Sequence, residues 1–291
     1  MGEGAKGRWP KPPPPSPHPQ SLIISRECRG QRPQLSRLKK DIMKLPLLPK
    51  IKGVFVTGTD TDVGKTLIAA ALTAALRRRG VAAAYFKPIQ SGCPEKGGKL
   101  LPTDAALARE LAGLTESLEL LTPIALRLPL APGVAAAREG VTVDLGRVAQ
   151  ALSELANRYD FFVVEGAGGL YVPLIDTTFL VLDLIRWLKL PLLVVARAGL
   201  GTINHTALTV LVAREQGLEV AGIILNRGSK TPGLAEQTNP AVIEALTGRP
   251  ILARVPEVTD LNEPTGREAL LAALAGVADR IMAGAAVEPP L

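Results

Sequence analysis

The sequence predicts an α/β fold with a doubly wound, mostly parallel sheet and helices on both of its faces. From residue 51 onward, short apolar runs typical of strands buried on both faces alternate with helical segments. A glycine-rich segment, GTDTDVGKT at 58–66, joins the first such run to the first helix. This alternation builds a parallel sheet whose ligands bind beyond the carboxyl ends of its strands.

The elements of the first half follow directly from this pattern. The run 54–57 is short, apolar and rich in β-branched residues, as expected for a strand. The segment 65–79 is predicted to be a helix that ends at Gly80, a residue favoured just after a helix. A second strand is expected at 81–86, and 104–112 is predicted to be helical.

The second half repeats the alternation. Strands are expected at the continuous apolar runs 161–164, 192–196, 220–225 and 251–255. Helices are expected at 144–159, 203–216, 240–247 and 266–282. Asp144 is a suitable N-cap for the first of these helices. The sequence contains no internal repeat and no sign of a second globular domain.

Composition narrows the class of protein. A chain of 291 residues that is 47% hydrophobic can bury the core of one sizeable domain. No apolar run reaches the roughly 18–20 residues of a membrane span, so we expect a soluble protein without a membrane partner. Cys28 and Cys93 are the only cysteines, which excludes a disulfide framework and favours a cytoplasmic location. Two cysteines and two histidines far apart also argue against a zinc site.

Residues 1–42 differ in composition from the rest of the chain. They are rich in proline and hold nine Lys or Arg against three acidic residues, so most of the net charge of +7 lies there. We expect a disordered extension, or the product of an upstream start codon, because Met43 begins a sensible protein. A polyproline II ligand is the alternative, and a targeting peptide is disfavoured. The single domain expected at 43–291 is nearly neutral, which argues against a nucleic-acid partner.

The glycine-rich segment 58–66 has the composition of a phosphate-binding loop. Gly58 and Gly64 let the backbone approach a ligand closely, so that successive N–H groups can point at phosphate oxygens. The start of the following helix adds partial positive charge. Lys65 is expected to reach the β- and γ-phosphates, and the Thr66 hydroxyl to bind Mg²⁺. Five residues separate the glycines, where the general pattern has four.

Two acidic residues are candidates for the remaining Mg²⁺ ligands. Glu165 ends the strand-like run FFVVE at 161–165 and leads into a glycine-rich turn, so it is expected at the carboxyl edge of the sheet. A charge at the end of a buried strand usually has a partner or a metal. Asp104 opens a predicted helix, where a simple N-cap is the other interpretation.

Five segments resemble the dethiobiotin synthetase family, in the family's order and at compatible spacing. They are VTGTDTDVGKT at 56–66, YFKPIQSG at 85–92, TDA at 103–105, VVEGAGGLYVPL at 163–174 and GLGTINHTALT at 199–209. A shorter likeness, ILNR at 224–227 with VPEV at 255–258, falls in the family's adenine-side region. The resemblance covers residue 51 to the mid-260s and implies a fold of the P-loop NTPase type.

The resemblance implies an ATP- and Mg²⁺-dependent ligase of biotin biosynthesis. In the family, one amine of 7,8-diaminopelargonic acid takes up CO₂ as a carbamate, and the carbamate attacks the γ-phosphate of ATP. The second amine then closes the ring of dethiobiotin and expels phosphate from the carbamic–phosphoric anhydride. The implied partners are these small molecules and a second copy of the chain, because family members act as homodimers.

Site residues carry over by position. The catalytic candidates are Lys87, Lys65 and Thr61, and the Mg²⁺ candidates are Thr66, Asp104 and Glu165. The candidates for substrate contacts are Ser91 and the loop Leu200, Gly201, Thr202, Ile203 and Asn204. In the family this loop binds the substrate carboxylate in the active site of the neighbouring subunit. The nucleotide candidates are Asp62, Val63, Gly64, Lys65, Thr66, Leu67, Asp104, Glu165, Gly166, Ala167, Gly168, Asn226, Arg227, Pro256, Glu257 and Val258. His205 is expected to pack locally, and Cys93, without a histidine partner, to be incidental.

Three other interpretations compete. Cobyrinic-acid-type amide synthases share the loop but need a glutaminase domain with a cysteine nucleophile, for which the chain after 161–165 offers no cysteine. Partitioning and cell-division ATPases carry an extra lysine where this loop has Asp60. An adaptor role for the proline-rich segment 1–42 would make the domain a scaffold.

Overall fold

The structure is a computed structural model that describes residues 45–229, 231–258, 260–261 and 263–283. These residues belong to one compact unit, Lys44–Leu291. The extension expected at residues 1–42 lies outside the described residues. None of the helices in the described ranges is both long and apolar enough to cross a membrane.

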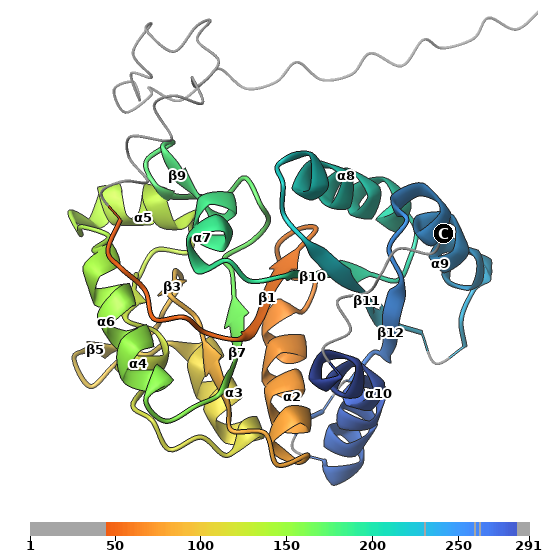
Figure 1. The fold of residues 1–291 in the computed structure, drawn as a ribbon, viewed down its shortest axis with the longest axis horizontal. Coiled ribbons are helices and arrows are strands. Elements are labelled where there is room, and N and C mark those ends of the chain that lie inside the picture. Colours follow the sequence, from red (N-terminus) through yellow and green to blue (C-terminus); the bar gives the residue numbers. More distant parts are fainter. Residues whose placement is uncertain (1–44, 230, 259, 262, 284–291) are drawn as a thin grey trace, which may run out of the picture. The chain divides into compact units, whose positions relative to one another are not determined.

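A six-stranded parallel sheet forms the centre of this unit (Figure 1). Its strand order is β12-β11-β10-β1-β7-β2: on one side of β1 the chain forms the edge strand β2 and then inserts β7, and on the other side β10, β11 and β12 follow outward in turn. The strands are β1 (Gly53–Gly58), β2 (Ala83–Phe86), β7 (Phe161–Glu165), β10 (Leu192–Arg197), β11 (Val220–Gly228) and β12 (Ile251–Pro256). The order reverses at β1, and in such sheets ligands bind beside the reversal at the carboxyl edge.

Helices cover both faces of the sheet, as the alternation predicted. Figure 1 shows α2 and α10 on one side of the central strands and α7 and α8 on the other. The helices are α2 (Lys65–Arg77), α3 (Thr103–Ala112), α4 (Leu118–Leu121), α5 (Pro132–Glu139), α6 (Leu145–Ala156), α7 (Val181–Leu188), α8 (Thr202–Glu215), α9 (Leu234–Thr247) and α10 (Pro264–Met282). Three two-stranded pairs lie outside the main sheet: β3 (Ile89–Gln90) with β6 (Ile124–Ala125), β4 (Glu95–Lys96) with β5 (Lys99–Leu100), and β8 (Pro173–Ile175) with β9 (Phe179–Leu180).

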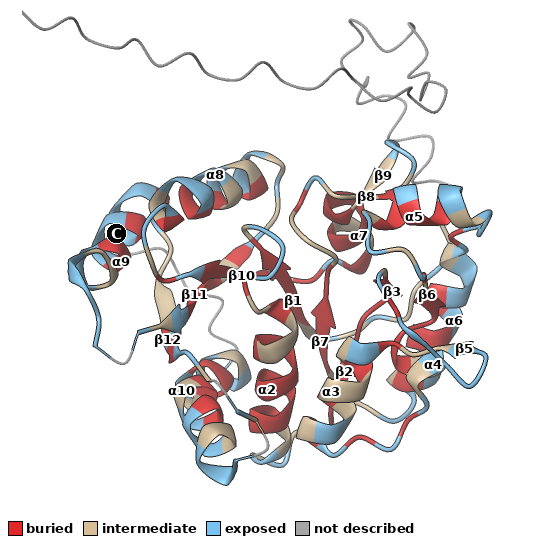
Figure 2. Ribbon diagram, turned by 180° about the vertical axis from the view of Figure 1, so that it is seen from behind, coloured by how far each residue is buried: buried red, intermediate tan, exposed pale blue. Residues whose placement is uncertain are grey.

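The core explains how a chain with few aromatic residues packs well. Helix α2 is buried along most of its length, as the red colour in Figure 2 shows, and its alanines let it lie close to the sheet. Phe55, Tyr85, Phe86 and Phe162 of the central strands are among the largest fully buried side chains. This packing holds the start of α2 at the carboxyl edge of β1 and β7.

Several predicted boundaries are wrong. The helix expected over 240–247 begins at Leu234, because Pro240 lies inside the helix and not in its first turn. The Thr238 hydroxyl donates to the Leu234 carbonyl, and this bond helps to hold the earlier turn. The strand expected from Val81 begins at Ala83, because the Val81 amide still donates to the end of α2. The other predicted elements shift by three residues or fewer at their ends, while the short helices α4, α5 and α7 were not predicted.

Candidate active site

The glycine-rich loop between β1 and α2 lies at the carboxyl edge of the sheet. Its Gly58 amide donates to the Gly168 carbonyl at 3.2 Å, and its Thr59 amide donates to the Val195 carbonyl at 3.0 Å. The loop is thereby fixed to the segments that follow β7 and to β10. Asp62 and Gly64 both have positive φ, 56° and 93°, so the backbone curls before α2 begins.

Gly64 is the N-cap of α2 and has no room for a side chain. A Cβ added there would lie 2.0 Å from Nδ2 of Asn226, which reaches across from β11. That Nδ2 donates to the Val63 carbonyl at 2.9 Å. The glycine therefore serves both the left-handed backbone and the close approach of β11 to the loop.

We predict that Gly64→Ala lowers nucleotide affinity at least tenfold, because the new methyl must displace Asn226 and with it the loop. The left-handed backbone alone accounts for roughly 1–2 kcal/mol of strain. Gly140→Ala is the matched control, since Gly140 also has positive φ, 66°, but open space around it. Calorimetric titration with ADP measures the affinity; equal ADP affinity in the two variants would contradict the steric argument.

Lys65 is buried at the start of α2 and points back to its own loop. Its Nζ donates to the Asp60 carbonyl at 2.9 Å. Burial lowers the pKa of Lys65, attraction by Glu165 opposes this effect, and the nearby Lys87 ammonium adds to it. A poorly solvated ammonium that is held by a carbonyl oxygen is well suited to donate hydrogen bonds to phosphate oxygens.

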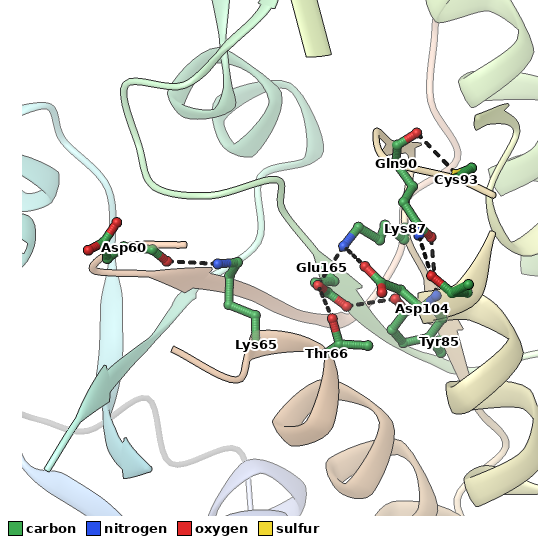
Figure 3. A network of polar contacts seen from close by, with 10 residues as sticks. Asp60, Lys65, Thr66, Tyr85, Lys87, Gln90, Cys93, Asp104 and Glu165 are labelled. Atoms are coloured by element: carbon green, nitrogen blue, oxygen red, sulfur yellow. Dashed lines mark hydrogen bonds and ion pairs between the residues drawn. The ribbon is translucent and has the colours of Figure 1, made fainter. Parts of the chain in front are cut away.

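Lys87 and Glu165 meet at the ends of adjacent strands. Lys87 follows β2, Glu165 ends β7, and the parallel register of the two strands places them side by side. Lys87 Nζ donates to Glu165 Oε1 at 2.7 Å and also to Asp104 Oδ2 (Figure 3). Burial by itself lowers the pKa of Lys87, but attraction by the two carboxylates outweighs it and raises the pKa, so the amine stays charged.

The Glu165 carboxylate accepts hydrogen bonds from several directions. The Thr66 hydroxyl donates to Oε1 at 2.8 Å, and the Tyr85 hydroxyl donates to Oε2 at 2.6 Å. The Glu165 side chain is only 1% exposed, so these hydrogen-bond donors and Lys87 are needed to offset the free-energy cost of burying a carboxylate. Burial, followed by the charge of Glu165, raises the pKa of Tyr85, whose hydroxyl therefore remains a donor.

The oxygen atoms gathered here fit a magnesium ion. Thr66, Asp104 and Glu165 are hydroxyl or carboxylate donors, the type that Mg²⁺ prefers. An ammonium already lies between the two carboxylates, which shows that the pair accepts positive charge at this point. No group of three His, Cys, Asp or Glu in the described part of the chain could hold a metal by itself. A magnesium ion here would thus need phosphate oxygens and water as its other ligands.

A glutamine that the sequence analysis missed fixes Asp104. Gln90 Nε2 donates to the Thr103 hydroxyl at 3.0 Å, and Gln90 Oε1 accepts from the Asp104 amide at 3.3 Å. The next residue, Ser91, is half-buried. Cys93 is buried and its pKa is raised to about 11, chiefly by burial, so it is an unreactive thiol as expected.

The candidate carboxylate loop at 199–204 follows β10 at the same edge of the sheet. Gly201 is the left-handed N-cap of α8, and Leu200 is 95% exposed. Asn239 of α9 was missed by the sequence analysis; its Nδ2 donates to the carbonyls of Ala198 and Gly199, both at 3.1 Å. His205 is exposed, which corrects the expectation that it packs locally. His205 lies four residues after the N-cap Gly201, which is about one turn into α8.

Strand β10, which precedes this loop, also contacts the phosphate-binding loop. Arg197, which ends β10, donates from its guanidinium to the Thr61 carbonyl at 3.5 Å. Asp62 and Thr61 are exposed beside this contact. An arginine at the end of a strand carried no motif that would have singled it out.

The adenine-side candidates gather at the ends of β11 and β12. The Glu257 amide donates to the Gly228 carbonyl at 2.9 Å, which brings Pro256, Glu257 and Val258 next to the residues after Asn226. Arg227 is exposed and has positive φ, 59°. The Oδ1 atom of Asn226 is buried and accepts no hydrogen bond from the described residues. It remains available to a donor on a ligand.

Comparison with known proteins yields close relatives. A family model described as "AAA domain" matches residues 52–265. The chain is 41% identical over 218 residues to the ATP-dependent dethiobiotin synthetase BioD of Thermodesulfovibrio yellowstonii, covering 72% of this chain and 91% of that protein. It is 45% identical over 212 residues to the protein of the same name from Bacillus licheniformis, covering 73% and 88%.

One solved structure supports the fold alone. The MinC:MinD cell division protein complex of Aquifex aeolicus aligns with a TM-score of 0.50 and 15% sequence identity, covering 82% of this chain and 98% of that chain. At this identity, a shared architecture carries no information about what is bound.

Proposed function

The chain belongs to the dethiobiotin synthetase family of ATP-dependent ligases, and from this premise we propose that it closes the ureido ring of dethiobiotin from 7,8-diaminopelargonate, CO₂ and ATP. The observation that carries the proposal is the buried Lys87 ammonium between Glu165 and Asp104, beside the phosphate-binding loop. A reaction that joins two anions, a carbamate and a triphosphate, needs a cation at the place where they meet.

The loop and Lys65 hold the triphosphate. Backbone amides at 62–66 and the start of α2 face the phosphate oxygens, and Lys65 exchanges the Asp60 carbonyl for the β- and γ-phosphates. Thr66, Asp104 and Glu165 would hold Mg²⁺ together with phosphate oxygens. When bound, the metal neutralises charge on the phosphates and orients them.

Lys87 serves the reacting groups. One amine of the substrate adds CO₂ and loses a proton to give a carbamate, whose oxygen attacks the γ-phosphorus as the bond to ADP breaks. The second amine then attacks the carbamate carbon, loses its proton, and expels phosphate. No covalent bond to the enzyme is required, so the contribution of Lys87 is to stabilise negative charge on the carbamate and on the transferring phosphoryl group. Thr61 and Ser91 contact the amine-bearing end of the substrate.

The loop Leu200–Asn204 receives the substrate carboxylate. Its backbone amides lie at the start of α8, where the helix favours an anion. We further propose a homodimer in which each loop serves the site of the other subunit. Leu200, Leu208 and Leu211 are exposed on or beside α8, as an interface between copies would require. On the nucleotide side, the adenine amine donates to the unsatisfied Oδ1 of Asn226.

Direct assay tests the function. Purified protein is incubated with diaminopelargonate, bicarbonate, ATP and Mg²⁺, and dethiobiotin and ADP are quantified by mass spectrometry. Equal amounts of both products, absent when bicarbonate or diaminopelargonate is omitted, are expected. ATP hydrolysis that does not depend on diaminopelargonate would instead favour a switch ATPase of the cell-division type and would overturn the proposal.

Deletion of residues 1–42 tests the adaptor interpretation. We predict that turnover of the truncated protein stays within twofold of the full chain, because the residues that form the candidate site all lie between 58 and 258. The measurement is the same dethiobiotin assay on both proteins. Loss of activity on truncation would assign the proline-rich segment a part in function.

A further inference from the structure

Glu165 is held asymmetrically by its donors. Oε1 accepts from Thr66 and Lys87, the residues that face the phosphate site, at 2.8 and 2.7 Å. Oε2 points away from them and accepts from the Tyr85 hydroxyl at 2.6 Å (Figure 3). Tyr85 is the one donor to Oε2 found among the described residues.

The strand pairing explains why Tyr85 can do this. Tyr85 and Lys87 are two residues apart, so both side chains leave the strand on the same side. Tyr85 pairs with Val163 in β7, and Phe86 with Val164, which brings Glu165 level with Lys87. The phenol reaches the carboxylate from within the core, where it is fully buried. The lysine reaches it from the edge.

We propose that Tyr85 is a positioning residue for the magnesium site: its hydroxyl fixes Oε2 of Glu165 so that Oε1 faces Thr66, Lys87 and the metal. The inference rests on the proposed function, in which Glu165 is a magnesium ligand. Without the phenol, the carboxylate can turn about its terminal torsion, which is broad and poorly restrained by itself. A ligand that turns freely binds metal more weakly, and loss of such outer partners lowers metal affinity by about 10–100-fold.

A second tyrosine–carboxylate pair supplies a matched control. The Tyr159 phenol lies beside the buried Glu116, which also pairs with Arg158 at 3.3 Å. Burial, followed by the proximity of Glu116, raises the pKa of Tyr159. Tyr159 precedes β7, at the opposite edge of the sheet from Glu165. Tyr159→Phe therefore removes the same phenolic hydroxyl from beside a buried carboxylate without touching the phosphate site.

The test compares the full chain with Tyr85→Phe, Tyr159→Phe and Glu165→Gln. Calorimetric titration measures ADP affinity with and without MgCl₂, and steady-state assays give kcat and the KM for Mg²⁺. Tyr85→Phe should raise the KM for Mg²⁺ about 10–100-fold, keep metal-free ADP affinity, and regain most of kcat at saturating Mg²⁺. Tyr159→Phe should leave all three unchanged, although it also removes a phenolic hydroxyl from beside a buried carboxylate.

The outcomes separate the inference from the proposed function. An unchanged Mg²⁺ dependence in Tyr85→Phe, alongside a weakened one in Glu165→Gln, overturns the positioning role and leaves the function standing. Normal Mg²⁺ affinity in Glu165→Gln also overturns it, because Tyr85 would then hold a carboxylate that binds no metal. The proposed function is tested separately: if the unaltered protein forms no dethiobiotin, the proposed function is wrong.

A measurement on the unaltered sequence covers the case in which Tyr85→Phe does not fold. The chain has only three tyrosines, so 3-fluorotyrosine labelling gives three ¹⁹F resonances, which Tyr159→Phe and Tyr171→Phe assign. Addition of MgCl₂ to the ADP-bound protein should move the Tyr85 resonance and leave that of Tyr159 in place. A Tyr85 resonance that does not move would overturn the proposal.

Discussion

Replacing Lys87 with alanine is expected to reduce dethiobiotin formation by about a thousandfold while ATP affinity stays within a few-fold of the unaltered protein. The ammonium stabilises charge on the reacting carbamate and phosphoryl group, whereas the nucleotide is held by the loop and Lys65. Single-turnover assays with saturating ATP, together with calorimetric ATP titration, separate the two effects. Normal turnover in Lys87→Ala would contradict the role assigned to this residue, even if the family assignment stands.

The same change should also destabilise the fold. Lys87 is 7% exposed and neutralises Glu165, which is 1% exposed, so its removal leaves a buried carboxylate without its cation. Breaking such a pair costs roughly 3–5 kcal/mol. Urea unfolding measures the loss, and assays below the unfolding transition keep activity interpretable. Lys52→Ala, at an exposed lysine before β1, is the control and should alter neither stability nor turnover.

Lys65→Ala is expected to lower both ATP affinity and turnover. Charge-assisted hydrogen bonds of about 1.5–3 kcal/mol to the phosphates would be lost, which corresponds to roughly 10–100-fold in affinity. Turnover should fall further, because the γ-phosphate loses a cation in the transition state. Titration with ATP and with ADP in parallel measures the share of binding that depends on the γ-phosphate.

Stability should separate the two lysines. Burial lowers the pKa of Lys65, whereas the carboxylates raise that of Lys87. The folded protein therefore pays a desolvation penalty at Lys65 that alanine removes, and the free energy of unfolding of Lys65→Ala should be equal to or above that of the unaltered protein. Marked destabilisation of Lys65→Ala, comparable with that of Lys87→Ala, would show that the Asp60 carbonyl contact matters more to the fold than burial does.

Much of the site could be anticipated because it follows strand ends. Lys87 comes directly after one predicted strand and Glu165 ends another, and the carboxyl ends of parallel strands share one edge. The placement of the phosphate-binding loop between β1 and α2 follows from the same rule. For Asp104 the spacing along the chain allowed two roles, helix N-cap or metal ligand. In the structure its carboxylate accepts a hydrogen bond from Lys87, and its backbone amide donates to Gln90.

The roles of other residues could not be inferred from the sequence, although Tyr85 and Gln90 lie within the segment YFKPIQSG at 85–92. Gln90, Asn239 and Tyr85 belong to ordinary strand or helix positions, and each acts on a residue that lies at least 13 positions away in the chain. Helix α9 was predicted to start too late, because proline is usual in a first turn but here lies within the helix. Such contacts can be recognised only when the packing of the strands and helices is known.

The sequence by itself determined the parallel sheet, the phosphate-binding loop and the residues at its carboxyl edge, because these depend on local periodicity, glycine placement and the direction of strands. Only the tertiary structure decided how the oxygens of Glu165 are shared among Tyr85, Thr66 and Lys87, and why Gly64 must lack a side chain. Those properties depend on the register of β2 with β7 and on how closely β11 approaches the loop. Both are set by the packing of segments far apart in the chain, so residue spacing in the sequence does not reveal them.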